Sequence, residues 1–135
     1  MRELSVYIYT DNLVNLTEVK MIVYGIVNCN TVKKSLDWIR ANELTYEFHD
    51  YKKKGITAEK LTEWFNVFGW EKVINKNGLT FKKLSKEEQQ SINSPEKAIA
   101  FLIQNTSAIK RPIVEIEGKP ILIGFKDEEY QQKLK

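Results

Sequence analysis

Residues 21–42 have the sequence MIVYGIVNCNTVKKSLDWIRAN, which predicts a strand, a polar turn and a helix. The short apolar run 21–24 includes β-branched residues and is closed by Gly25, which is typical of a buried strand. A helix over 31–42 is predicted by three apolar residues at helical spacing, Val32, Leu36 and Ile39. Cys29 is therefore expected directly after a strand and directly before a helix.

The segments on either side extend this unit into a sheet. Polar and apolar residues alternate over 45–50, which predicts a second strand. One helix between two strands makes a βαβ unit, so these strands should be parallel. Farther along, the apolar runs 113–116 and 120–123 are joined by the tight link 117–119, which predicts an antiparallel hairpin. Asp127 is then expected to cap a last, mostly polar helix.

The chain between the βαβ unit and the hairpin is predicted to be helical. A helix begins after Thr57, a good N-cap residue, and ends at Gly69. Its apolar stripe consists of Leu61, Trp64, Phe65 and Phe68. Residues 75–84 are predicted to form a loop. Two more helices follow, with caps at Ser85 and Ser94. This order predicts a thioredoxin-like α/β fold: a four-stranded mixed sheet with an inserted helical subdomain at about 57–105.

Length and composition predict one globular domain. The chain has 135 residues, of which 42% are hydrophobic and 29% charged, with a formal net charge of +3. We expect the domain to span residues 21–135. Residues 1–20 stand apart and are predicted to be an N-terminal extension, either disordered or loosely docked.

Cysteine and histidine are scarce, which limits the kinds of site. One cysteine cannot close an internal disulfide, and this suits a reducing compartment, so we expect a cytoplasmic protein. With a single histidine as well, we expect no metal site and no bound cofactor. No stretch is long enough to cross a membrane, and the first residues lack a signal-peptide pattern. The lysines of 52–54 and 82–83 are expected to be solvated, so direct nucleic-acid binding is not predicted.

Cys29 is the first candidate for chemistry. Backbone N–H groups at a helix start favour negative charge, so the thiol there should be more acidic than a free cysteine. Lys33, one helical turn on, can add positive charge. The same N–H groups can bind an oxyanion or the carboxylates of a peptide thiol. The alternative is a small buried apolar residue. Asn28 and Asn30 suit a solvated turn and favour the functional interpretation.

Arg111 and Pro112 are the second candidates. They lie just before the third predicted strand, where thioredoxin-like folds carry a cis-proline close to the cysteine. Only about 5% of X-Pro bonds are cis by default, so this expectation depends on the fold resemblance. Arg111 would then point its guanidinium at whatever is bound to the sulfur. Its alternative role is that of a surface arginine beside a strand.

Three segments in register resemble the arsenate reductase-like (ArsC) family, which also contains the Spx/MgsR regulators. They are 24–34 (YGIVNCNTVKK), 48–51 (FHDY) and 110–113 (KRPI). The segments GKP (118–120) and IGF (123–125) are also similar to an uncharacterised branch of this family. The resemblance runs from about residue 21 to residue 134. It implies a thioredoxin-like fold and a reactive cysteine.

The match to the arsenate reductases of this family includes the cysteine but not most of their arginines. In its glutaredoxin-linked arsenate reductases the thiolate attacks arsenate, glutathione attacks the adduct, and glutaredoxin resolves the mixed disulfide. Several arginines surround the oxyanion there, and only Arg111 matches one of them. The histidine four before the cysteine corresponds to Gly25, and Lys33 replaces an arginine. The other two arginine positions fall near Asn75 and Gly124, which argues against arsenate turnover because a neutral group cannot replace a guanidinium.

The resemblance leaves three functions open. The first is a glutathione-dependent thiol/disulfide oxidoreductase with Cys29 as nucleophile, glutathione as co-substrate and glutaredoxin as a candidate partner; an external thiol would resolve the adduct. Its ligand would contact Asn28, Asn30, Thr31, Lys33, Arg111 and Pro112. The second is a Spx-like regulator that binds RNA polymerase, without the Cys-x-x-Cys switch because residue 32 is valine. The third is a retained fold without activity.

Overall fold

The computed structural model describes residues 19–135, and its centre is a four-stranded mixed sheet with the order β2-β1-β3-β4. The predicted extension 1–20 lies outside the described residues except for its last two. The strands are β1 (Met21–Gly25), β2 (Glu47–Asp50), β3 (Ile113–Ile116) and β4 (Lys119–Ile123). β1 and β2 are parallel, and β3 and β4 are antiparallel, as the sequence predicts. The structure adds that β3 also pairs with β1, in antiparallel orientation.

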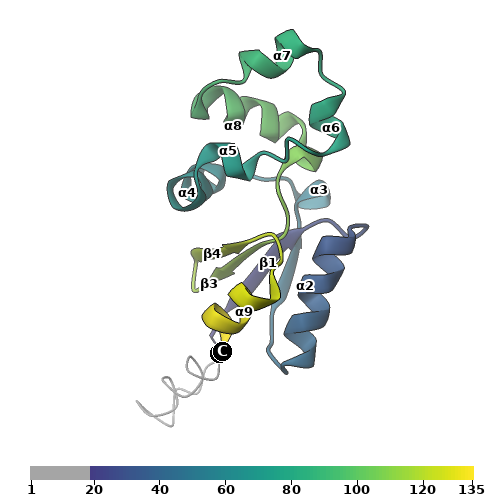
Figure 1. The fold of residues 1–135 in the computed structure, drawn as a ribbon. Coiled ribbons are helices and arrows are strands. Elements are labelled where there is room, and N and C mark those ends of the chain that lie inside the picture. The colour runs from purple at the N-terminus through teal and green to yellow at the C-terminus, as the bar shows by residue number, and fades with distance from the viewer. Residues whose placement is uncertain (1–18) are drawn as a thin grey trace.

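Helices cover both faces of this sheet. Helix α2 (Asn30–Ala41) connects β1 to β2, and α9 (Asp127–Leu134) follows β4. Between β2 and β3 the chain forms a run of short helices. They are α3 (Tyr51–Lys54), α4 (Ala58–Phe68), α5 (Trp70–Val73), α6 (Leu79–Lys82), α7 (Lys86–Ser91), α8 (Pro95–Gln104) and the 3₁₀ helix η2 (Thr106–Ala108). Figure 1 shows α4–α8 gathered at one end of the molecule, with α2 and α9 at the other; α4–α8 are called the helical part below.

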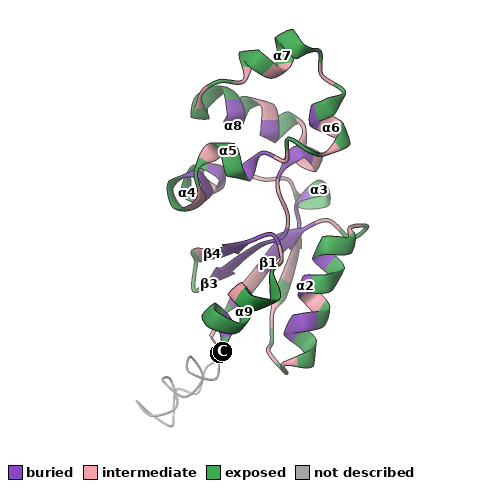
Figure 2. Cartoon of the chain, viewed as in Figure 1, coloured by how far each residue is buried: buried purple, intermediate pink, exposed green. Residues whose placement is uncertain are grey.

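Two hydrophobic clusters hold these layers together. Along β1 and β3 the side chains alternate between the faces, as a strand requires. Val23 and Val114 pack with α2 and α9 in one cluster, whereas Tyr24 and Ile113 pack with the helical part in the other. Figure 2 shows the strands largely buried and α7 mostly exposed. The helical part therefore shares its core with one face of the sheet.

The predicted caps at Thr57, Gly69, Ser85 and Ser94 are found in the structure. The Thr57 hydroxyl accepts a hydrogen bond from the Lys60 N–H, and Gly69 ends α4 with a φ of 91°. Ser85 forms a full capping box with Glu88, and Ser94 caps α8.

The structure corrects the sequence predictions at three places. Residues 75–84 are not wholly a loop, because α6 lies within them and Phe81 packs edge-on against the Phe101 ring. A short helix, α3, directly follows β2, with Asp50 accepting hydrogen bonds from the N–H groups of the second and third helical residues. Asp127 is not the cap of the last helix but its first residue; the N-cap is Lys126, whose side chain makes no capping hydrogen bond. Short helices of this kind give little periodic signal.

The link between β3 and β4 is a two-residue turn. Glu117 and Gly118 both have positive φ, at 51° and 79°. Two-residue hairpins favour such left-handed conformations because their twist matches that of the strands.

Among residues 19–135, no helix is both long and apolar enough to cross a lipid bilayer.

Candidate functional site

Cys29 lies at the junction of β1 and α2. It is the N-cap residue of α2, with extended backbone (φ −149°, ψ 122°), and its carbonyl accepts the first helical hydrogen bond from the Lys33 N–H at 3.0 Å. The thiol is free and half-buried. Gly25 brings α2 close to β1, because a Cβ at residue 25 would lie 2.8 Å from a methyl group of Val32. The first turn of α2, which follows Cys29, therefore packs tightly against β1.

Opposing effects act on the Cys29 thiol. Partial burial raises its pKa. The backbone N–H of Val32, the guanidinium of Arg111 and the N–H of Thr31 lower it by more, so the pKa lies below its usual value. The helix start and the arginine together thus favour the thiolate, as the sequence predicts for a cysteine at this position.

Arg111 is held against the sulfur by its own chain segment. The Arg111–Pro112 peptide bond is cis. Nη1 of Arg111 donates to the carbonyls of Ser107 at 2.8 Å and Ile109 at 3.1 Å. The Tyr51 hydroxyl donates to the same Ile109 carbonyl at 3.1 Å, which connects this segment to α3. Nε of Arg111 is buried and has no hydrogen-bond partner among the described residues, so one donor is left over.

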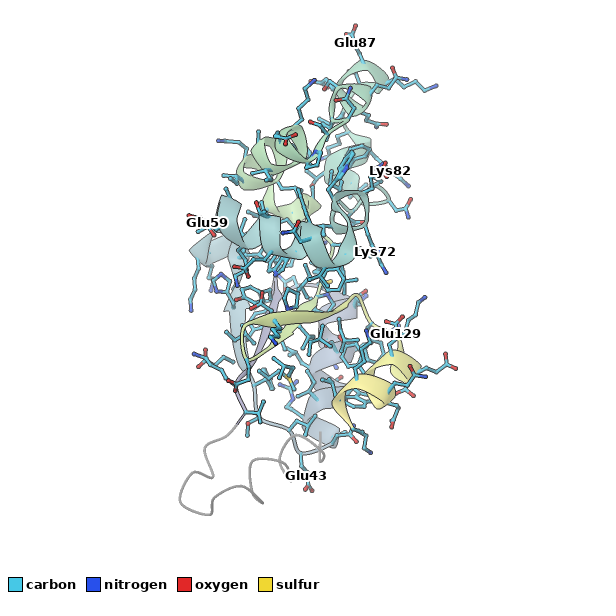
Figure 3. All side chains as sticks on the ribbon, turned by 90° about the vertical axis from the view of Figure 1, so that its left-hand side faces the viewer. Glu43, Glu59, Lys72, Lys82, Glu87 and Glu129 are labelled. Atoms are coloured by element: carbon cyan, nitrogen blue, oxygen red, sulfur yellow. The ribbon has the colours of Figure 1, made fainter. Side chains whose placement is uncertain are left out.

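A cavity of about 430 Å³ opens beside Cys29 and Arg111. Four parts of the chain form its walls. They are the start of α2, residues 72–75 in and after α5, residues 110–111 before β3, and residues 123–129 from the end of β4 into α9. Four cationic side chains and one carboxylate line it: Lys72, Lys110, Arg111, Lys126 and Glu129. Figure 3 shows Lys72 from the helical part and Glu129 from α9 on the same side of the molecule. The cavity is thus strongly cationic with a single negative wall group.

A second hollow of about 570 Å³ lies on the other side of Cys29. It is mostly apolar, and its walls are built by α2, β2 and the turn before α2. The predicted site residues Asn28, Asn30 and Lys33 line this hollow rather than the cationic cavity. Lys33 forms an ion pair with Asp37 at 2.7 Å, so its charge is directed along α2. Cys29 is the residue common to both linings.

The structure brings only part of the predicted set together. Cys29, Thr31 and Arg111 line the cationic cavity. Pro112 is buried beneath it, and its carbonyl accepts a hydrogen bond from the Gly124 N–H at 2.8 Å. The two positions matched to family arginines, Asn75 and Gly124, do line this cavity, but neither carries charge. The roles assigned to Asn28, Asn30 and Lys33 remain predictions.

Sequence reasoning missed four charged residues of the cavity, Lys72, Lys110, Lys126 and Glu129. They belong to segments far apart in the chain, and each resembles an ordinary solvated residue in sequence. Lys110 gave the one available signal, because it directly precedes Arg111 in the segment that carries the family resemblance. Among residues 19–135, groups of His, Cys, Asp or Glu side chains that could hold a metal ion are absent.

Replacing Arg111 with alanine should raise the pKa of Cys29 toward that of a free thiol, because the variant removes both a hydrogen bond and a positive charge from the sulfur. We expect thiolate reactivity at neutral pH to fall about tenfold. The measurement is the rate of Cys29 alkylation by iodoacetamide as a function of pH. Lys34→Ala is the matched control, because Lys34 is an exposed cation on α2 that lines neither hollow. This variant should leave the pH profile of Cys29 alkylation unchanged. Equal profiles for all three proteins would contradict this role of Arg111.

Known proteins are similar to this chain in sequence. The sequence model of the ArsC family matches residues 24–133. An uncharacterised protein of Haemophilus influenzae is 39% identical over 109 residues, which cover 81% of this chain and 94% of that protein. The regulatory protein MgsR of Bacillus subtilis is 22% identical over 111 residues, covering 80% of this chain and 85% of MgsR.

Solved structures agree with the sheet described above. The structure of the YffB (PA3664) protein is 39% identical and superposes with a TM-score of 0.79, covering 85% of this chain and 99% of that one. Together with the strand order, this likeness shows that the fold is the thioredoxin-like α/β fold predicted from the sequence.

Proposed function

The chain belongs to the ArsC family, and we propose that it is a glutathione-dependent thiol/disulfide oxidoreductase with Cys29 as its nucleophile. One observation carries the proposal: a thiol of lowered pKa lies in the wall of a cationic cavity large enough for a small anionic thiol. A low thiol pKa raises the thiolate fraction at neutral pH, and the cations attract carboxylates.

The proposed reaction has two thiol–disulfide exchanges. In the first, the Cys29 thiolate attacks the glutathione sulfur of a mixed disulfide, forms a Cys29–glutathione disulfide and releases the substrate as a thiolate. In the second, the thiolate of another glutathione attacks this adduct, forms glutathione disulfide and restores the Cys29 thiolate. Overall, one free glutathione and the mixed disulfide give the substrate thiolate and glutathione disulfide, so the added glutathione is the reductant. An external thiol is needed because the chain has one cysteine.

Arg111 and the cavity lysines would bind the glutathione. Two carboxylates of the tripeptide need cationic partners, and Arg111, Lys72, Lys110 and Lys126 line the cavity. Charge-assisted hydrogen bonds from these groups would hold the carboxylates beside Cys29. Glutathione would thus be a co-substrate, and glutaredoxin is a candidate protein that could accept the glutathionyl group from Cys29.

Arsenate is not the substrate we propose. A tetrahedral oxyanion is best held by several guanidinium groups, and the described part of the cavity offers one, that of Arg111. Gly124 has a φ of 77°, so a side chain there would strain the backbone. Residue 25 has no room for a larger side chain next to Val32. The lysines of this cavity act as point charges, which suit the separate carboxylates of a ligand longer than arsenate.

The alternative function is that of a regulator that binds RNA polymerase. It is favoured by the match to the regulatory protein MgsR over 80% of this chain. The two functions differ in what they require of Cys29, because a regulator without a second cysteine does not need a reactive thiol. Affinity capture from a bacterial lysate with the immobilised wild-type chain and with Cys29→Ser tests the alternative, and equal recovery of polymerase subunits by both would support it.

We further propose that the protein works in the cytoplasm, where a glutathione pool is available.

The proposal is tested by incubating the reduced protein with glutathione disulfide and measuring intact mass and the Cys29 peptide. We expect one glutathionyl group on Cys29, and its removal when reduced glutathione is added. Turnover is then measured with the mixed disulfide of glutathione and 2-mercaptoethanol, coupled to glutathione reductase and NADPH. Absence of both adduct and turnover would overturn the proposal.

A further inference from the structure

Glu129 is the one carboxylate among four cations in the described lining of the Cys29 cavity. It lies on α9, whose position is fixed by its neighbour Tyr130. The Tyr130 side chain is fully buried, and its hydroxyl lies 2.8 Å from the Ser35 hydroxyl and donates to the Gly124 carbonyl at 2.9 Å. Gly124 is itself part of the cavity wall. These hydrogen bonds hold α9 against α2 and Gly124, and thereby keep Glu129 at the cavity.

The charges of the cavity are not paired with one another. Lys72, Lys110, Lys126 and Glu129 form no ion pair within residues 19–135, where surface pairs such as Lys33–Asp37 and Lys76–Glu71 do form. Glu129 therefore does not serve to neutralise a neighbouring lysine in this arrangement. Its charge also favours the first turn of α9, but Asp127 and Glu128 do the same without lining the cavity.

Such a lining discriminates between kinds of anion. A carboxylate in the wall repels a simple oxyanion and weakens the attraction of the four cations. A ligand that carries two carboxylates and one ammonium group gains from both kinds of wall group. A cavity of about 430 Å³ is in the usual size range for small-molecule sites. Glutathione has this charge pattern, with its ammonium on the γ-glutamyl residue.

We propose that Glu129 recognises the α-ammonium group of the γ-glutamyl residue, so that the cavity selects a zwitterionic thiol over a simple oxyanion. The inference rests on the proposed function and names the group that makes the cavity specific for glutathione. In the first exchange, Glu129 would bind the ammonium while Arg111 and the lysines bind the two carboxylates. When glutathione disulfide takes the place of the mixed disulfide, the Cys29 thiolate attacks the nearer sulfur, forms the Cys29–glutathione disulfide and releases reduced glutathione as the thiolate. Glu129 is a specificity residue and takes no part in the electron transfer.

The test compares two disulfides on three proteins. Glutathione disulfide and the disulfide of N-acetylglutathione, whose ammonium is blocked, are each mixed with the wild-type chain, with Glu129→Gln and with Glu128→Gln. The readout is the second-order rate of adduct formation on Cys29, measured by mass spectrometry. Glu128→Gln is the matched control because Glu128 is exposed, adjacent in α9 and outside the cavity lining. Thermal unfolding of each variant confirms that the fold is intact.

We expect the wild type and Glu128→Gln to prefer glutathione disulfide about tenfold, the usual effect of losing one charge-assisted hydrogen bond. Glu129→Gln should lose this preference, mainly through slower reaction with glutathione disulfide. The inference is overturned if Glu129→Gln keeps the preference, or if it accelerates both disulfides equally. A wild type that forms no adduct with either disulfide overturns the proposed function and this inference with it, whereas an adduct without preference overturns the inference alone.

Discussion

Replacing Cys29 with serine should reduce disulfide turnover to the background rate and remove the glutathionyl adduct completely. A serine hydroxyl is not ionised near neutral pH and cannot form the sulfur–sulfur bond on which both exchanges depend. The readouts are NADPH consumption in the coupled assay and intact mass after incubation with glutathione disulfide. Because the chain has one cysteine, no other residue can take up the adduct.

The control for this variant is its stability. Cys29 is half-buried at the N-cap of α2, and serine is a favourable N-cap residue. We therefore expect the unfolding midpoint of Cys29→Ser to equal or exceed that of the wild type. Wild-type turnover in a correctly folded Cys29→Ser protein would exclude the sulfur as the nucleophile.

Replacing Glu115 with alanine should lower the free energy of unfolding by about 3 kcal/mol, the lower end of the range for breaking a buried ion pair. Glu115 lies on β3, its side chain is 1% exposed, and it accepts from three donors. They are Trp64 Nε1 at 2.8 Å, Lys60 Nζ at 3.1 Å and the Tyr24 hydroxyl at 3.3 Å. Alanine would leave buried donors unpaired at the contact between the sheet and the helical part.

The effect stays at the lower end because the Lys60 side chain is 24% exposed and can turn toward water. The surroundings of Glu115 also affect Tyr24: burial first, and then the nearby carboxylate, raise its pKa to about 12. Glu63→Ala is the matched control, because Glu63 pairs with the same Lys60 at 3.0 Å but is 51% exposed. That variant should cost less than about 1 kcal/mol. Equal costs for the two variants in urea unfolding followed by circular dichroism would contradict this account of Glu115.

The fold was largely predictable because its signals are local. The run 21–24 before Gly25, the spacing of apolar residues in α2, and the serine and threonine caps each fix an element within a few residues. The parallel pairing of β1 and β2 then follows from the single helix between them. The short helices α3 and α6 could not be predicted, because four residues show no periodicity and depend on tertiary contacts such as that of Phe81.

The site was predictable only at its centre. Cys29 and Arg111 stand in segments whose sequence marks them, but the rest of the cavity is assembled from α5, β4 and α9 by the fold. Glu115 shows the same limit: a charged residue in an apolar strand is expected at a solvated face, and its burial depends on Trp64 and Lys60 from α4. The role of Lys33 beside the ligand stays a prediction; in the structure its side chain pairs with Asp37 on its own helix.

The central claim is that Cys29 is a reactive thiolate in a site for glutathione, and the pH dependence of its alkylation tests it most directly. Iodoacetamide is reacted with the wild-type chain across a range of pH, with and without S-methylglutathione, whose blocked sulfur does not consume the reagent, and Cys29 modification is followed by mass spectrometry. We predict an inflection below that of a free thiol, about 8.5, and slower alkylation when S-methylglutathione is present. An inflection at the free-thiol value, with no protection by S-methylglutathione, would contradict the account.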